Sequence, residues 1–231
     1  MTTEVHGLPE FYASAGGEVA ARLVAARLRA LWPALPGMSV LGIGHAAPYL
    51  GLWRAEARRA VALVPAHLRA AARPGATVAE EEHLPFTDRS FDRVLLVHGL
   101  EAAENARRLL REVWRVTRDD GRVIVVAPNR TGLWAHLERT PFGHGQPYSR
   151  GQLERLLARQ LFHVERREAA LFVPPLGLRW WRGVAPATER LGRTVMPRLG
   201  GVVMLEAEKD LFAALPAGAV AVRRRVVVEA A

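Results

Sequence analysis

Short apolar runs, separated by turns that contain glycine or proline, recur through the first 130 residues of the chain. The runs have the length of β-strands. The clearest of them, Val94-Leu95-Leu96-Val97, is apolar throughout, as in a strand buried on both faces of a sheet. Such runs predict strands at residues 38–41, 59–64, 76–79, 91–98 and 122–127.

Segments with helical periodicity lie between these runs. In residues 10–32 and 105–117, apolar side chains recur three and four positions apart, and arginines occupy many of the other positions. Ser149 is a typical N-cap and predicts a helix over 149–161. Weaker patterns predict helices at 48–59 and 67–72, and strands at 164–173 and 202–207.

The alternation of strand and helix predicts βαβ units, and therefore a doubly wound α/β fold whose parallel sheet is covered by helices. Ligands in such folds bind beyond the carboxyl ends of the strands. The residues at those ends are the first candidates for function: Gly42 to Ala46, Pro65 to His67, Glu80, His98 and Pro128-Asn129.

The first strand runs into a glycine-rich turn, Gly42-Ile43-Gly44-His45-Ala46. Glycines let the backbone approach a ligand closely, and a helix that begins there favours anionic or polar groups. Taken alone, two glycines favour a purely structural turn. Further segments follow in order, however: Glu80 to Phe86, Ser90-Phe91-Asp92-Arg93-Val94, Leu109 to Val116, and Asp120 to Val126.

This series resembles the class I S-adenosylmethionine-dependent methyltransferases, in particular the branch with a small single domain. The resemblance covers residues 40–129 well and continues more loosely through Tyr148-Ser149 and the helix after it. It implies a Rossmann-like doubly wound sheet, mostly parallel with an antiparallel last strand, and helices on both faces. It also implies one domain over 1–231, made of an N-terminal helical cap (1–37), a cofactor-binding core (38–130) and an acceptor side (131–231).

The resemblance assigns the cofactor, S-adenosylmethionine, to residues at the strand ends. Gly42 and Gly44 match the loop around its methionine and ribose. Glu80 matches an acid near the adenine amine, and Glu81 takes that place if the register slips; a solvated acidic loop is the competing interpretation. The full set of expected cofactor contacts is Leu41, Gly42, Gly44, His45, Pro65, Glu80, Glu81, Leu84 and His98.

Two positions depart from the family pattern. Ala46 replaces the third glycine of the turn, which costs little unless that residue needs a positive φ. Pro65 stands where the family has an acid that holds the ribose hydroxyls, and no acid occurs between Glu56 and Glu80. A lost carboxylate removes hydrogen bonds of about 1.5–3 kcal/mol each. Three interpretations stay open: a working enzyme with an unusual ribose contact, a weak binder, or a non-catalytic relative that serves as a binding or partner subunit.

Methyl transfer to a small-molecule acceptor is the function that the resemblance implies. The cofactor carries the activated methyl group, so the protein mainly aligns the acceptor and excludes water. A base is needed when the acceptor is an alcohol, a phenol or a protonated amine. The candidates for contact with the acceptor are His98, His144 and Tyr148, with either histidine as the base. A structural role at a strand end is an equally good interpretation of His98.

The amino-acid composition excludes several kinds of chemistry. The chain has no cysteine, which excludes disulfides and thiolate chemistry, and its eight histidines show no metal-ligand spacing. The formal net charge is +9, yet Lys209 is the only lysine among 32 basic residues. Scattered arginines in a chain rich in alanine and glycine indicate GC-rich codons more than a nucleic-acid surface. An RNA methyltransferase is therefore an alternative that composition does not favour.

The segment from Trp180 to Arg198 mixes aromatic residues with arginines. It is typical of a helical lid, and it could also cover the acceptor, contact an anionic membrane surface or stack on RNA. No signal peptide and no apolar run of membrane-spanning length occur, so we expect a cytoplasmic protein. The sequence does not define the oligomeric state.

Overall fold

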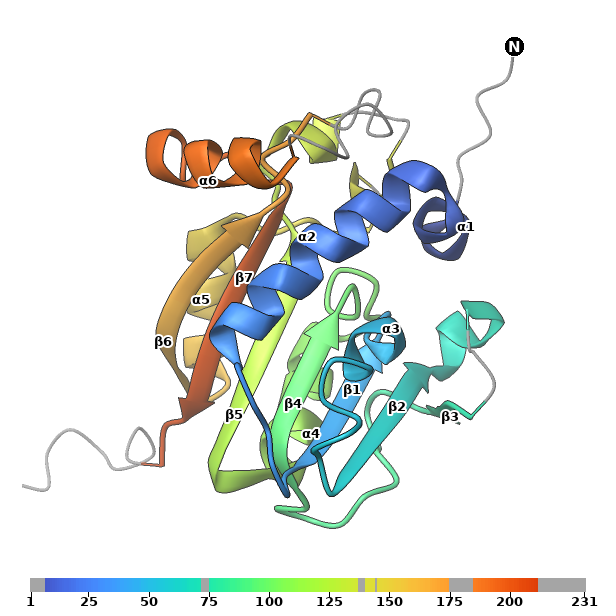
Figure 1. The fold of residues 1–231 in the computed structure, drawn as a ribbon. Helices are drawn as coiled ribbons and strands as arrows, with labels where there is room; N and C mark the ends of the chain where they lie inside the picture. The colour runs from blue at the N-terminus through green and yellow to red at the C-terminus, as the bar shows by residue number, and fades with distance from the viewer. Residues whose placement is uncertain (1–6, 72–74, 137–139, 144, 175–184, 212–231) are drawn as a thin grey trace, which may run out of the picture.

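The computed structural model describes residues 7–71, 75–136, 140–143, 145–174 and 185–211. Its strands are β1 (Ser39–Gly44), β2 (Arg59–Pro65), β3 (Thr77–Ala79), β4 (Phe91–Val97), β5 (Thr117–Pro128), β6 (Phe162–Ala170) and β7 (Val202–Lys209). They form one sheet in the order β3-β2-β1-β4-β5-β7-β6 (Figure 1). Strands β1 to β5 run parallel, and β7 runs antiparallel to both β5 and β6. The predicted fold class is confirmed, including the antiparallel last strand.

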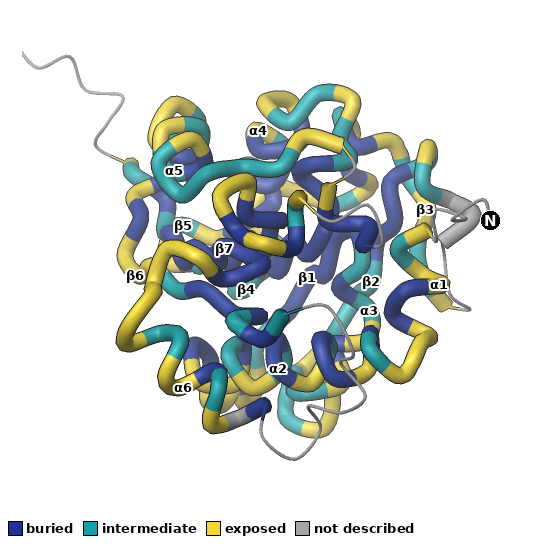
Figure 2. The backbone as a smooth tube through the Cα atoms, turned by 90° about the horizontal axis from the view of Figure 1, so that it is seen from above, coloured by how far each residue is buried: buried dark blue, intermediate teal, exposed yellow. Residues whose placement is uncertain are grey.

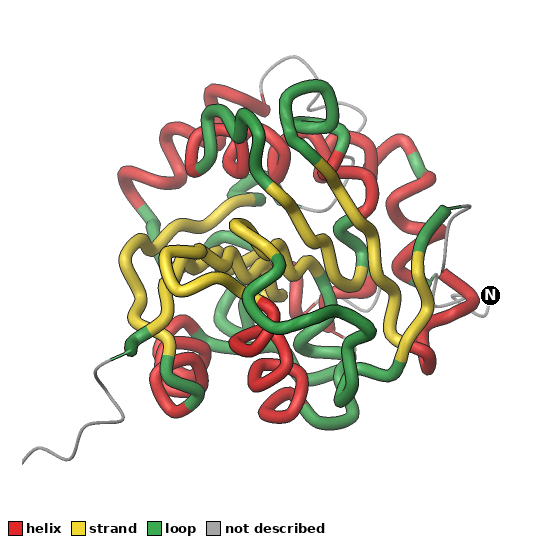
Figure 3. The backbone as a smooth tube through the Cα atoms, turned by 90° about the horizontal axis from the view of Figure 1, so that it is seen from below, coloured by secondary structure: helices red, strands yellow, loops and turns green. Residues whose placement is uncertain are grey.

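Helices cover both faces of this sheet. The α-helices are α1 (Leu8–Ala13), α2 (Ala15–Leu31), α3 (Ala47–Leu50), α4 (Ala106–Val116), α5 (Arg150–Arg159) and α6 (Ala185–Val195), and the 3₁₀ helices are η1 (Ala66–Ala71), η2 (Leu133–His136) and η3 (Pro141–Gly143). Figure 2 shows α2, α3 and α6 on one side of the buried strands, with α4 and α5 on the other. From the opposite end, the strands again form one layer between helices (Figure 3).

Side-chain alternation along the strands explains the two layers. In β4, Leu95 and Val97 pack in the apolar cluster beneath α2 and α3, whereas Val94 and Leu96 pack in the cluster beneath α4 and α5. Successive side chains of a strand point to opposite faces, so a continuous apolar run supplies both clusters at once. This is why β1, β4 and the second half of β5 were predictable as apolar runs, whereas β6 is interrupted by exposed charged residues.

Two predicted helices differ from the structure. The helix expected over 10–32 is two helices, because Ser14 is extended and its hydroxyl caps α2 by accepting a hydrogen bond from the Gly17 amide at 3.1 Å. The helix expected over 48–59 is limited to α3 and is followed by turns. The indole of Trp53 lies fully buried in these turns and donates to the carbonyl of Trp32 at 2.8 Å, a long-range contact that local periodicity does not reveal.

The carboxyl ends of β1, β2 and β4 meet at one edge of the sheet, and α1 lies over that edge (Figure 1). The prediction that Ser149 caps a helix is confirmed, since its side chain and that of Gln152 form a capping box at the start of α5. No helix in the described part of the chain has the length and apolar character needed to cross a membrane.

Candidate functional site

The glycine-rich turn after β1 is shaped by close backbone packing against the end of β4. Gly44 has a φ of +76°, and a Cβ on it would lie 2.6 Å from the carbonyl oxygen of Val97 and 2.9 Å from the Cα of Gly99. Any larger residue would push the turn away from β4. Ala46, which replaces the third glycine of the family pattern, has a φ of −82°, so no positive φ is required there. The alanine is therefore free of backbone strain.

His98 comes directly after β4 and is buried at this same edge. Its φ is +50°, an uncommon conformation for a residue other than glycine. Its Nδ1 lies 2.7 Å from a carboxylate oxygen of Glu101, and its Nε2 lies 2.8 Å from the hydroxyl of Tyr12 in α1. All three side chains are buried. The structure therefore contains a hydrogen-bonded chain, Glu101–His98–Tyr12, which we call the histidine relay.

The phenol of Tyr12 connects the relay to the glycine-rich turn. Its ring stacks on His45, with the ring centroids 4.5 Å apart and an interplanar angle of 18°. Burial raises the pKa of Tyr12 well above its usual value, and the nearby Tyr49 and Glu101 raise it further. Tyr12 is thus a neutral phenol that can both donate and accept a hydrogen bond.

The expected adenine side lies at the ends of β2 and β3. Pro65 ends β2 and is buried, and Glu80 is exposed just after β3. Glu81 is buried instead, where one carboxylate oxygen accepts from the Asn105 amide at 2.8 Å. The other oxygen lies 3.8 Å from Nδ1 of His67 and has no hydrogen-bond partner in the described structure. A buried carboxylate oxygen is therefore open to a donor on this side.

Two of the sequence segments that follow the glycine-rich turn are joined in space. The Leu84 amide donates to the carboxylate of Glu112 at 2.8 Å, and the guanidinium of Arg115 donates to the carbonyls of Leu84 and Phe86. The hydrogen bond from Arg115 also lowers the pKa of Glu112, although burial opposes that shift. Glu112 and Arg115 on α4 thus hold the loop that follows β3.

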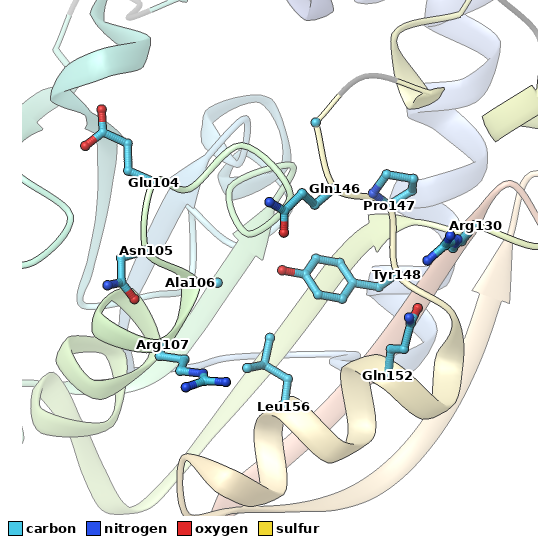
Figure 4. A pocket seen from close by; sticks show the side chains of 11 residues that line it. Glu104, Asn105, Ala106, Arg107, Arg130, Gln146, Pro147, Tyr148, Gln152 and Leu156 are labelled. Carbon is cyan, nitrogen blue, oxygen red and sulfur yellow. The ribbon is translucent and has the colours of Figure 1, made fainter.

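Tyr148 lies on the other side of Glu101. Its ring borders a cavity of about 840 Å³ between the start of α4, the segment before α5 and α5 itself (Figure 4). Its hydroxyl is 3.5 Å from the carbonyl of Leu100, and burial, with a smaller effect of Glu101, raises its pKa. Gln146 also lines this cavity, and its backbone amide donates to the carbonyl of Glu101 at 3.0 Å. The cavity wall is therefore hydrogen-bonded to the backbone of a relay residue.

The structure brings some of the sequence candidates together and separates others. His98 and His45 contact Tyr12 at one edge, and Gly44 precedes His45 in the same turn. Leu41 is fully buried within β1. Pro65, Glu80 and Glu81 lie apart from this group, at the ends of β2 and β3. His144 and residues 175–184 lie outside the described residues. Sequence reasoning missed Tyr12 and Glu101. Glu101 stands only three residues after His98, which is a usable signal, whereas Tyr12 is 86 positions away and gave none.

The sheet has this strand order, a glycine-rich turn after β1 and a polar edge beyond the parallel strands. Together these features define a Rossmann-like α/β fold. A family model described as a methyltransferase domain matches residues 39–125. Residues 39–125 of the chain are therefore a methyltransferase domain, in line with the expected resemblance to the class I S-adenosylmethionine-dependent methyltransferases.

Individual relatives are distant. An uncharacterized Mycobacterium tuberculosis protein is 32% identical over 114 residues, which cover 46% of this chain and 40% of that relative. The match therefore spans less than half the length of this curated relative. A Thermotoga maritima S-adenosylmethionine-dependent methyltransferase superposes with a TM-score of 0.58 at 18% identity, over 87% of this chain and 93% of that chain.

A second solved structure has a similar fold. It is the complex between the Haloferax volcanii Trm112 methyltransferase activator and a methyltransferase, with a TM-score of 0.61 at 15% identity, covering 89% of this chain and 99% of that chain. At these identities, both solved structures support the fold alone.

Proposed function

We propose that this protein transfers a methyl group from S-adenosylmethionine to a small molecule whose acceptor atom is a hydroxyl oxygen. The observation that carries the proposal is the histidine relay at the carboxyl edge of the sheet. Ligands of doubly wound sheets bind at this edge, and an imidazole held by a carboxylate there is suited to accept a proton. When bound, the cofactor supplies a methyl group on a sulfonium, which needs no further activation by the protein.

Residues along the carboxyl edge of the sheet fit this cofactor in part. The turn at Gly44 brings backbone close to the end of β4, where the methionine part of the cofactor would lie. The free oxygen of Glu81 would accept from the adenine amine, with exposed Glu80 as the alternative acceptor. Pro65 offers no carboxylate to the ribose, and His67, two residues further along, is the nearest polar side chain in sequence. We therefore expect weaker cofactor binding than a ribose-binding acid would provide.

The relay would handle the proton of the acceptor. The carboxylate of Glu101 accepts a hydrogen bond from Nδ1, which leaves Nε2 of His98 as the basic nitrogen. The hydroxyl of Tyr12 donates to Nε2 and can accept from an acceptor hydroxyl at the same time. As the acceptor oxygen bonds to the methyl group, its proton would pass through the Tyr12 hydroxyl to Nε2. Burial excludes competing water from these groups.

The decisive test is a calorimetric titration of the purified full chain with S-adenosylmethionine and, separately, with S-adenosylhomocysteine. We expect micromolar binding that weakens in Glu81→Gln, with Glu154→Gln on α5 as the control. The absence of heat and of thermal stabilisation at millimolar ligand would overturn cofactor binding by the isolated chain. Binding without turnover across a panel of phenols and alcohols would overturn the acceptor class.

Pro65 supports a second candidate function, a non-catalytic partner subunit with a methyltransferase fold. The similar Haloferax protein is seen in a complex with an activator, so activity that depends on a partner is a further form of this candidate. A chain that binds neither cofactor form alone, and gains no binding in a lysate of its source, would favour the non-catalytic function over the enzyme.

A further inference from the structure

Exposed apolar side chains gather on one small part of the surface. Seven large hydrophobic residues are exposed within the described chain, and four of them belong to α6 and the turn after it. Their exposed fractions are 65% for Leu191, 61% for Val195, 53% for Met196 and 41% for Leu199. We call these four residues the α6 patch.

The packing of α6 explains why these residues face outward. On the opposite side of the helix, a Cβ on Gly192 would lie 2.4 Å from the Cβ of Phe172, so the helix sits directly on that residue. Buried Glu189 also accepts a hydrogen bond from the Phe172 amide at 2.6 Å. Leu191 and Val195 lie four residues apart on the face that is left. The helix is therefore anchored through one face and presents an apolar face to solvent.

Arginines flank the α6 patch. Arg190 and Arg198 are exposed beside it, and the guanidinium of Arg150 donates to the carbonyl of Pro197 at 3.1 Å. Glu189 is the only carboxylate residue between positions 185 and 201, and it is buried. Within this described stretch no exposed acidic side chain opposes the arginines. Outside it, Glu154 of α5 lines a hollow together with Arg150 and Arg198, but it is paired with Arg167 at 3.0 Å.

The α6 patch lies at the edge of the sheet that holds the candidate site. Asn129, directly after β5, donates to the carbonyls of Arg198 and Gly200, and the Gly132 backbone is in close contact with Gly200. Leu133, which begins η2 after this contact, is itself 57% exposed. Figure 1 shows α6 and α1 at the same end of the molecule. A surface bound by the patch would therefore lie near the carboxyl ends of the parallel strands.

We propose that the α6 patch docks on an anionic lipid bilayer, with its apolar side chains in the interfacial layer and its arginines on the lipid phosphates. Protruding leucine, valine and methionine beside cationic groups match the two parts of such a surface. RNA would pair with the arginines but leave the apolar side chains in water, so it fits the patch less well. This docking does not depend on the proposed methyl transfer.

Vesicle flotation with the full chain tests the proposal. We expect binding to phosphatidylcholine vesicles that contain about one quarter phosphatidylglycerol, and binding at least about tenfold weaker to pure phosphatidylcholine. The double variant Leu191→Glu/Met196→Glu should bind anionic vesicles at least about tenfold more weakly. Arg190→Ser/Arg198→Ser should bind about thirtyfold more weakly, since each arginine near the surface contributes about 1 kcal/mol. The control is Leu211→Glu, another exposed apolar position, and it should bind like the unaltered protein.

Other outcomes would overturn the docking. Equal binding to neutral vesicles, or unchanged binding by Leu191→Glu/Met196→Glu, excludes this surface as the lipid contact. A concentration-dependent increase in mass that the same variant abolishes, without vesicle binding, identifies a second copy of the chain as the occupant. All variants are at exposed positions, and thermal unfolding together with S-adenosylhomocysteine titration checks that each remains folded. A chain that binds vesicles but not the cofactor retains the docking and loses only the proposed function.

Discussion

The Nδ1 atom of His98 lies 2.7 Å from the carboxylate of Glu101, and this contact determines which imidazole nitrogen is basic. An ionised carboxylate only accepts, so Nδ1 carries the hydrogen and Nε2 presents its lone pair to the Tyr12 hydroxyl at 2.8 Å. The order of the three groups gives the relay a direction, from the hydroxyl of Tyr12 toward the carboxylate of Glu101.

His98→Asn should remove the base and preserve the backbone. Asparagine tolerates the φ of +50° at this position better than most residues do, so the turn after β4 should remain intact. We expect the methyl-transfer rate to fall about 10²- to 10⁴-fold, with cofactor affinity within about threefold of the unaltered protein. Single-turnover transfer of a labelled methyl group measures the rate, and calorimetry measures the affinity.

The matched control for this change is His163→Asn, an exposed histidine paired with Glu165 on β6. It should leave both the rate and the affinity unchanged. Tyr12→Phe separates the relay from a simple packing role, because it keeps the ring stacked on His45 and removes only the hydroxyl. A normal rate in Tyr12→Phe would show that the proton does not pass through this phenol.

Pro65→Asp should strengthen binding of S-adenosylhomocysteine. The family places a ribose-binding acid at this position, and a carboxylate there would add charge-assisted hydrogen bonds of about 1.5–3 kcal/mol each. We expect the dissociation constant to fall about tenfold or more, as measured by calorimetry. Pro65→Asn has nearly the same shape without the charge and should give a smaller gain. Equal affinities for the two variants would mean that the ribose does not lie at the end of β2.

Gly44→Ala and Gly37→Ala compare two glycines that both have positive φ. A Cβ added to Gly37 would have no other atom within 4 Å, whereas a Cβ on Gly44 would lie 2.6 Å from the Val97 carbonyl oxygen. Gly37→Ala should therefore lower the free energy of unfolding by about 1–2 kcal/mol through backbone strain alone. Gly44→Ala should cost about 2 kcal/mol more, because the turn must also move.

Urea denaturation measures both glycine variants, and titration with S-adenosylhomocysteine measures the effect on the site. Only Gly44→Ala should weaken cofactor binding. Similar stability losses in the two variants would indicate that the turn can shift without cost, and would weaken the case that close packing requires Gly44.

Features held by local contacts were predictable from the sequence, and features held by contacts between distant residues were not. Buried strands were predictable because each apolar run serves both faces of the sheet, and the helix cap at Ser149 is a local interaction. The break at Ser14 was missed because helical periodicity continues across it. The turns after α3 were missed because a distant contact of Trp53 holds them.

In the candidate site, too, the residues brought in by long-range contacts were not predictable from the sequence. His98 was predictable from its place at the end of an apolar run. Its partner Tyr12 comes from an N-terminal helix 86 positions away, and only the folded chain brings the two together. The positions of Glu80 and Glu81 differ in burial although they are adjacent, since the Asn105 amide at the start of α4 holds Glu81. Local sequence identifies the acidic segment, and tertiary contacts select the residue that faces inward.

Glu206 on β7 provides a test of stability that is independent of the site. Its side chain is fully buried, accepts a hydrogen bond from the indole of Trp32 at 2.8 Å, and is paired with Arg166 and Arg122. Burial alone would raise the pKa of this carboxyl, but the hydrogen bonds from Arg166 and Trp32 and the charges of the two arginines outweigh it and lower the pKa. The ionised form is therefore stabilised by folding.

Glu206→Gln should lower the free energy of unfolding by about 3 kcal/mol at neutral pH, because it breaks a buried ion pair. A lowered pKa contributes stability above the unfolded-state value of about 4.3, and that contribution is lost as the pH falls through the folded-state pKa. The difference in the free energy of unfolding between the unaltered protein and Glu206→Gln should thus be constant near neutrality. It should narrow only in more acidic solution. Urea denaturation across this pH range measures it. Glu208→Gln, a half-exposed neighbour 3.8 Å from Arg122, is the control and should cost less than about 1 kcal/mol. Equal losses in the two variants, or a difference that does not change with pH, would show that the buried charge of Glu206 is not the source of the stabilisation.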